Sequence, residues 1–362
     1  MKIPQLTDIQ QLSIDSMRTF VQQEVAPNAA SMRFGPASRE HLLEFTQAVA
    51  DFGLPGLAVP KAFGGSGMDW VTQARLFEEL VKGSPELASV VLVNMLAVEL
   101  LMSQPALRSQ YLPDLLAGRS IAGLGPALVD GKPGNALQAR RVGEGFMVDG
   151  NIEEVASGMW ANFLISSVSL DDQSSCFLLL DRRRDRYETR GIRLESNAAR
   201  VQLTDTPVGA DYCLGDAGPN ALLSRRLQVF LRLHEGIARV AQGQAILDAT
   251  LAAASLPPVH EGPAAGEQLL TLHLAEMITQ IESARLMCHH GLMLAQGGGD
   301  CEAQASMALF FAQGAVARVE RHADWVDDSQ SVRRPVFTLQ LGPLSCAPSK
   351  DQARHIVSRR VN

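Results

Sequence analysis

Side chains that could carry out chemistry are concentrated at two places in the sequence. The first is a loop near the C-terminal end, where Cys346 follows a Gly-Pro turn and Ser349 is a candidate N-cap for a final helix. No histidine, lysine or arginine adjoins Cys346, so the sequence does not predict a reactive thiolate there. The second is a long helical pattern in which Arg232 and Glu235 stand three residues apart. That spacing suits an ion pair on one face of a helix.

The run 288–290, Cys-His-His, contains metal-ligating residue types without a ligand spacing. Adjacent residues of a helix point in different directions, so the two histidines are not expected to hold one ion, and we predict no metal site. The five cysteines are Cys176, Cys213, Cys288, Cys301 and Cys346, and no two form a Cys-x-x-Cys pair. This usage, together with the lack of an apolar leader in the first residues, predicts reduced thiols in a cytoplasmic protein.

The composition favours a folded protein with a large core and argues against two kinds of partner. Hydrophobic residues make up 46% of the chain and charged residues 20%, which is not the composition of a disordered chain. The net charge of −7 argues against nucleic-acid binding, which requires clustered lysine and arginine. The basic run 182–184 is flanked by Asp181 and Asp185, as is typical of a solvated turn. No stretch approaches the roughly 18 apolar residues of a membrane span.

The first 119 residues have the hydrophobic period of helices. An apolar stripe predicts a helix from Ile9 to Val25, which Pro27 is expected to stop, and a second helix from Arg39 to Phe52. Asp69 is suited to cap a third helix and Pro85 to open a fourth. A short fifth helix precedes the change of pattern near residue 120.

Short alternating apolar runs between residues 120 and 210 predict five to seven strands. Beyond them we expect three long helices and a short final one. The predicted domains are therefore an N-terminal helical domain (1–119), a middle β-barrel or sandwich (120–215) and a C-terminal four-helix bundle (216–362). Because helices and strands are segregated along the chain, the predicted fold class is α+β.

Segments spread along the chain carry a resemblance to a known family. "LPGLAVPKAFGGSGMDWVTQARLFEEL" is similar to a stretch leading into the third and fourth helices of that family, and "RRVGEGFMVDG" to its Gly-x-Gly-Tyr-x-Leu-x-Gly hairpin. "RVAQGQAILDATLAAA" and "LHLAEMITQIESARLM" are similar to two helices of its C-terminal bundle. The family is the acyl-CoA dehydrogenases. The resemblance implies the three-part fold, an oligomer, and an FAD cofactor that accepts a hydride from an acyl-CoA while a carboxylate takes the α-proton.

The residue at the family's usual base position cannot act as a base. In most of the family that base is a Glu in a Tyr-Glu-Gly-Thr stretch, and the resemblance aligns this stretch with residues 346–349, where Ala347 takes its place. A methyl group cannot accept a proton. A subset of the family carries the base before an arginine of the first bundle helix, but here the residue before Arg232 is Leu231. Glu235, one turn from Arg232, remains as a candidate displaced base.

The positions aligned with the family's flavin contacts are also altered. The Trp-Ile-Thr-Asn stretch that packs on flavin falls on residues 154–157, so Glu154 replaces the aromatic ring and Ala156 and Ser157 take the last two positions. A carboxylate beside an anionic cofactor is unfavourable without a cation nearby. Trp160 is a candidate replacement ring or an ordinary core residue. Of the loop that touches flavin and acyl-CoA in the family, only Pro126 is clearly retained.

The contacts that the family makes across subunits are missing as well. Its Arg-x-x-Phe-Gly stretch falls on residues 256–260, which contain no arginine and end at His260. Its Gln-x-x-Gly-Gly turn falls near residues 325–328, where two aspartates stand. Because these changes occur together, FAD binding by the chain alone is doubtful.

Three functions remain open on the sequence. The first is a non-catalytic subunit that pairs with an active acyl-CoA dehydrogenase in an α2β2-type complex, acting on an acyl-CoA such as one with a bulky or steroid side chain. The second is a flavin-dependent oxidoreductase on CH–CH bonds with a relocated base. The third is a non-enzymatic, homo-oligomeric acyl-binding or structural protein. In each, Arg232 is the candidate for residual acyl-CoA binding.

Overall fold

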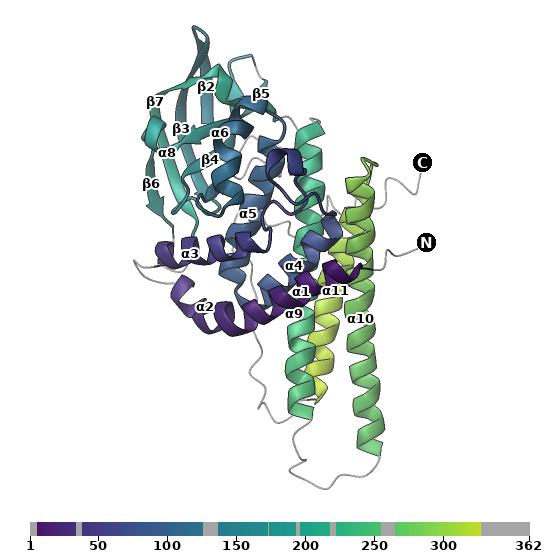
Figure 1. Cartoon of the computed structure of the whole chain (residues 1–362). Helices are drawn as coiled ribbons and strands as arrows, with labels where there is room; N and C mark the ends of the chain where they lie inside the picture. The colour runs from purple at the N-terminus through teal and green to yellow at the C-terminus, as the bar shows by residue number, and fades with distance from the viewer. Residues whose placement is uncertain are drawn as a thin grey trace.

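The structure is a computed structural model and describes residues 6–33, 38–125, 137–172, 174–192, 196–217, 222–254 and 265–326. Helices come first, then a β-sheet, then three long helices, so the predicted α+β order is confirmed (Figure 1). The sheet lies at one end of the molecule, and the long helices run away from it.

The N-terminal helices begin where local capping chemistry favours them. They are α1 (Asp8–Phe20), α2 (Ala26–Arg33), α3 (Ser38–Asp51), α4 (Trp70–Gly83), α5 (Pro85–Leu101) and α6 (Pro105–Leu116). The Asp69 side chain caps α4 by accepting a hydrogen bond from the Thr72 amide at 2.7 Å, as the sequence predicts. Pro85 occupies the first turn of α5, where its missing N–H has no cost.

The prediction that Pro27 stops the first helix is wrong. A π-helical turn, Val21–Val25, follows α1 and leads directly into α2, with Pro27 in the first turn of the new helix. A proline is tolerated there because that N–H would have no helical partner. The π turn places Val21 and Val25 against α4, where a Cβ on Gly83 would come within 2.3 Å of Val21 Cγ1. The π turn, which helix propensity does not predict, thus occurs where the helix packs closely on α4.

The described strands form one eight-stranded sheet in the order β6-β7-β3-β2-β4-β5-β8, with β1 pairing on β4. The strands are β1 (Ala122–Leu124), β2 (Leu137–Val142), β3 (Gly145–Val155), β4 (Phe163–Leu170), β5 (Ser175–Asp181), β6 (Glu188–Gly191), β7 (Ala199–Gly209) and β8 (Cys213–Asp216). The pairs β1–β4 and β2–β4 are parallel, and the other pairs are antiparallel. Short helical segments lie at Lys61–Phe63, Arg182–Asp185 (α8) and Ala210–Tyr212.

Both faces of strands β4 and β5 are buried. Phe163, Ile165 and Phe177 belong to the core shared with the helices. Leu164 and Leu178, their neighbours in sequence, belong to a second core within the β-domain. Since successive side chains of a strand point to opposite faces, these two strands separate the two cores.

The C-terminal helices are α9 (Leu222–Ala254), α10 (Ala265–Gln296) and α11 (Glu302–Val326). Their distal halves extend beyond the N-terminal helices and share a core of their own (Figure 1). The predicted fourth helix falls after residue 326 and lies outside the described residues.

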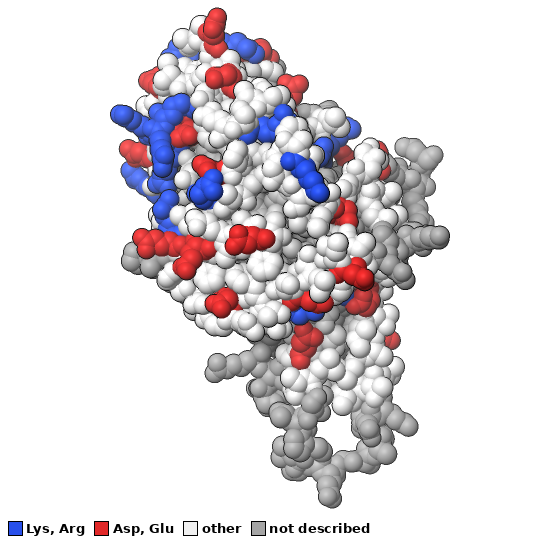
Figure 2. Space-filling view, viewed as in Figure 1, with Lys and Arg blue, Asp and Glu red and all other residues white. Residues whose placement is uncertain are grey.

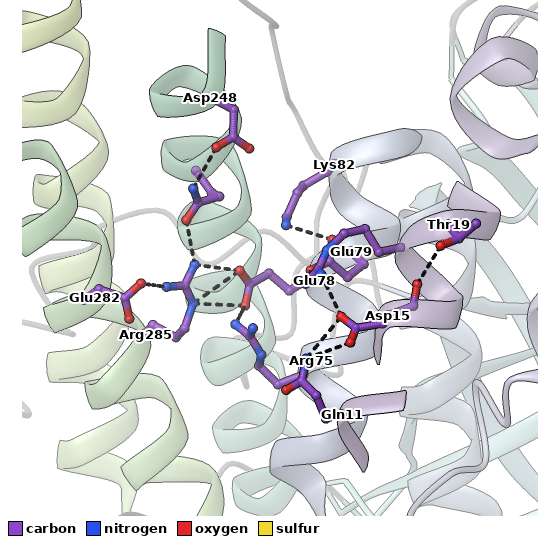
Figure 3. A network of polar contacts seen from close by, with 12 residues as sticks. Gln11, Asp15, Thr19, Arg75, Glu78, Glu79, Lys82, Asp248, Glu282 and Arg285 are labelled. Atoms are coloured by element: carbon purple, nitrogen blue, oxygen red, sulfur yellow. Dashed lines mark hydrogen bonds and ion pairs between the residues drawn. The ribbon is translucent and has the colours of Figure 1, made fainter. Parts of the chain in front are cut away.

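A buried ion network joins α4 to the bundle (Figure 3). Glu78 of α4 accepts a hydrogen bond from Nη2 of Arg285 of α10 at 2.8 Å and another from Nη1 of Arg75, also at 2.8 Å. Burial alone would raise the pKa of Glu78, but the positive charges of Arg285 and Arg75 outweigh it and hold that pKa below its usual value. Gln244 of α9 accepts a further bond from Arg285, so the network includes three helices.

Basic side chains gather over the sheet on the face shown in Figure 2. The predicted turn at residues 182–184 is the short helix α8, and the side chains of Arg182 and Arg184 have partners within the chain. Arg182 donates to the Met159 carbonyl at 3.0 Å, and Arg184 pairs with Asp185 and stacks on Tyr212. These contacts make the run a structural feature of the β-domain.

Candidate functional site

Arg232 is a buried cation whose hydrogen-bonding capacity is largely unused. It lies in α9 with 9% of its surface exposed. Its Nη2 reaches Gln228 Oε1 at 3.5 Å, the outer limit of a hydrogen bond. Within the described part of the chain, Nε and Nη1 have no hydrogen-bond partner. A buried guanidinium in this state is unfavourable for folding, which is the condition under which a ligand-binding role is expected.

Glu235 and His234 follow on the same helix and are also buried. His234 donates from Nδ1 to the Phe230 carbonyl at 2.8 Å and stacks on the Phe230 ring with centroids 4.0 Å apart. Burial lowers the pKa of His234 to about 4, so its ring is neutral near pH 7. Sequence reasoning missed His234, since a single histidine in a helical pattern does not reveal its surroundings. Glu235 is 6% exposed, which suits a buried base better than a surface glutamate.

The predicted flavin-contact stretch ends strand β3 in a tight turn. Glu154 is half-buried, at a point where the pairing of β3 with β7 changes register. Ala156 pairs with Leu124 of β1 through two backbone hydrogen bonds of 2.9 and 3.1 Å. Ser157 is buried and has a φ of 55°, which is uncommon for a residue other than glycine. Such strained positions are frequent at ligand sites.

Trp160 is engaged within the β-domain. Its Nε1–H donates to Asn197 Oδ1 at 3.1 Å, and its ring packs against the core shared with the helices. The ring therefore has a structural role already, which favours the second of the two interpretations made from the sequence.

Helix α5 lies between the two parts of the candidate site, because it contacts both β1 and α9. Its Asn94 is fully buried and accepts a hydrogen bond from the Ala122 amide at 2.9 Å. Asn94 thereby fixes the strand that pairs with Ala156. The sequence signal for Asn94 is one amide within the apolar run "VVLVNMLAV", and it identifies a buried polar contact without identifying its partner.

Several predicted positions lie outside the described residues. These are Pro126, Ala347, Cys346, His260 and the aspartates at 327 and 328. The assignments at those positions therefore stay predictions.

The cysteine–histidine run of α10 has the character of a core segment. Cys288 is fully buried, and burial raises its pKa to about 12. Across the ranges that the structure describes, no three His, Cys, Asp or Glu side chains are grouped as metal ligands. Nor is any helix in those ranges both long enough and apolar enough to cross a membrane.

Comparison with protein families identifies both helical parts of the chain. Residues 7–119 match the acyl-CoA dehydrogenase N-terminal domain, and residues 224–323 match the acyl-CoA dehydrogenase C-terminal domain. The chain belongs to the acyl-CoA dehydrogenase family. It is 24% identical over 346 residues to human mitochondrial short-chain specific acyl-CoA dehydrogenase, covering 88% of this chain and 80% of the human protein.

Solved structures show the same fold. Butyryl-CoA dehydrogenase from Megasphaera elsdenii superposes with a TM-score of 0.84 at 17% identity, over 100% of both chains. PigA, in its complex with FAD, gives a TM-score of 0.81 at 18% identity, over 100% of this chain and 99% of PigA. At these identities the likeness concerns the fold alone.

Proposed function

We propose that the chain is a non-catalytic subunit that pairs with an active, FAD-dependent acyl-CoA dehydrogenase in an α2β2-type complex. One observation carries the proposal: the resemblance to the family aligns Ala347 with the family's catalytic glutamate. Without a carboxylate there, the α-proton of a bound acyl-CoA has no acceptor at the usual position. The pair would act on an acyl-CoA with a bulky acyl group, such as a steroid side chain.

The residues at the flavin position support weak or absent FAD binding. Glu154 stands at the aromatic position and is half-buried, so its charge would oppose an anionic cofactor. The indole of Trp160 is hydrogen-bonded to Asn197 and packs against the core, so it is a poor replacement for the family's flavin-stacking tryptophan. FAD supplies the electron acceptor in the family; in this proposal it is held by the partner subunit.

Arg232 supports retention of an acyl-CoA ligand. Two of its buried guanidinium nitrogens lack partners among the described residues, and an anionic or carbonyl oxygen would satisfy them. A ligand-binding subunit without chemistry would keep this group and lose the base.

An apolar stripe on α10 supports association with another chain. Leu272, Leu286 and Met293 are at least 36% exposed and recur at multiples of seven residues. That period is typical of helix-to-helix contacts between chains. The partner, in this proposal, covers the stripe.

A relocated base is the second candidate, because Glu235 is buried on the same helix as Arg232. It would make the chain a flavin-dependent oxidoreductase on CH–CH bonds. The two functions are distinguished by assaying the purified chain with added FAD, a range of acyl-CoAs and an artificial electron acceptor. The first predicts no turnover above background. Turnover that is lost in Glu235→Gln and kept in Glu282→Gln, an exposed position of α10, would support the second and refute the first.

A further inference from the structure

Two cysteines from distant parts of the sequence meet at the edge of the β-sheet. Cys176 lies in β5 and Cys213 begins β8, the neighbouring edge strand. Both cysteines are free, and each thiol shifts the pKa of the other. Cys176 is 4% exposed, whereas Cys213 is half-buried.

The local backbone explains how the two thiols meet. Cys213 lies opposite Leu178, whereas Cys176 lies opposite Asp216, because the register shifts at this point. Cys176 and Leu178 are two residues apart in β5 and share a face, so Cys213 and Cys176 lie on the same side of the sheet. Both pack against the core of the β-domain. Gly215, with a φ of 130°, lies in the same short strand and permits a backbone conformation that other residues rarely adopt.

The environments of the two sulfurs differ in a way that suits a reactive pair. The Cys176 thiol lowers the pKa of Cys213, despite partial burial. The Cys213 thiol, together with burial, raises the pKa of Cys176. Of the two sulfurs, Cys213 is therefore the one that ionises more readily, and Cys176 the one that keeps its proton. A thiolate next to a second thiol is the arrangement found at peroxide-reactive cysteines.

We propose that Cys213 and Cys176 form a redox pair that reacts with hydroperoxides and closes a disulfide between β8 and β5. The Cys213 thiolate attacks one peroxide oxygen; an S–O bond forms as the O–O bond breaks, and the departing oxygen leaves as water or an alcohol after taking a proton. Cys213 is thereby oxidised to a sulfenic acid and the peroxide is reduced. The Cys176 sulfur then attacks Cys213, an S–S bond forms, the S–O bond breaks, and the hydroxyl leaves with the Cys176 proton as water.

The position of β8 gives the disulfide a structural consequence. β8 is the last strand before α9, the helix that carries Arg232 and Glu235. Contacts between α9 and β8 already join the two elements. A disulfide between β8 and β5 would fix β8 against an inner strand of the sheet. Because β8 contacts α9, oxidation would thus restrain the strand that packs against the helix of the candidate ligand site.

The test is a thiol map of the full chain after brief treatment with hydrogen peroxide and alkylation of the remaining thiols. We expect a peptide map under non-reducing conditions to show residues 176 and 213 cross-linked. Two thiols should be lost per chain, and dithiothreitol should recover both. Cys176→Ser is expected to stop at a sulfenic acid on Cys213 that dimedone traps, and Cys213→Ser to leave Cys176 unreacted. Cys288→Ala, in the bundle core, is the control and should cross-link like the unsubstituted chain.

The map of the unsubstituted chain tests the proposal even if a serine variant fails to fold. Oxidation of Cys213 to a sulfinic acid without a cross-link would contradict it. So would a thiol at residue 213 that reacts no faster than that of Cys288, or a disulfide between other cysteines.

Discussion

At the scale of single residues, Arg232 is the strongest candidate for a ligand contact, because its guanidinium is buried and two of its nitrogens lack a hydrogen-bond partner among the described residues. Its unpartnered nitrogens stabilise nothing within the described chain, so we predict that Arg232→Gln leaves the free energy of unfolding unchanged or raises it. The same change should weaken acyl-CoA binding about tenfold to a hundredfold, the loss expected for one charge-assisted hydrogen bond. Isothermal titration with butyryl-CoA and longer acyl-CoAs measures the affinity, and urea unfolding measures the stability.

Arg239→Gln is the matched control, because Arg239 lies two turns further along α9 and already contacts Gln242. It should leave acyl-CoA affinity unchanged. If Arg232→Gln destabilises the fold strongly and affinity does not change, Arg232 is a structural residue of the bundle and the ligand role is wrong.

His234 predicts a pH dependence of stability. Its pKa is lowered from 6.5 to about 4 in the folded chain, so below pH 6.5 the unfolded state binds a proton that the folded state refuses. The contribution of His234 to the free energy of unfolding is complete above pH 6.5. It decreases as the pH falls toward 4, by roughly 3 kcal/mol in total. His234→Gln, which can still donate to the Phe230 carbonyl, should remove that part of the decrease. Urea unfolding at pH 7 and pH 4.5 measures how much free energy of unfolding each protein loses between the two pH values. An equal loss in both proteins would count against the assignment.

At the scale of helices, the ion network of Figure 3 determines how α4 attaches to the bundle. Glu78→Gln removes the partner of the buried Arg285 and should lower the free energy of unfolding by about 3–5 kcal/mol. Glu282→Gln removes an ion pair whose carboxylate is 53% exposed, and should change it by less than about 1 kcal/mol. Thermal and urea unfolding compare the two variants. Equal effects would mean that Glu78 is not the central anion of the network.

Helix starts were predictable where the signal is local, and the exceptions depend on tertiary contacts. Asp69 and Pro85 act within one turn of their own helices, so the sequence is sufficient. The effect of Pro27 could not be predicted, because the π turn before it packs against Gly83, a contact across 58 or more residues that periodicity does not contain. The partners of Asn94 and Cys213 were hidden for the same reason. The site positions at Ala347 and Pro126 rest on the resemblance, and the domain limits stay a prediction.

At the scale of the whole molecule, the α10 stripe predicts an assembly. Leu272→Glu combined with Leu286→Glu places two charges on the surface that the partner is proposed to cover, and should shift the complex to smaller species in gel filtration at equal concentration. Ile9→Glu, on α1 and 68% exposed, is the control and should leave the elution volume unchanged. An unaltered mass for the α10 variant, determined by light scattering, would place the interface elsewhere.

The most direct test of the account is an absorption spectrum of the chain purified by itself. A non-catalytic subunit with Glu154 at the flavin position and Ala347 at the base position is predicted to be colourless, and to gain no flavin bands after incubation with FAD and removal of the excess. Flavin bands in the near-ultraviolet and blue at close to one FAD per chain would contradict the account, and would direct attention to Glu235 as the base.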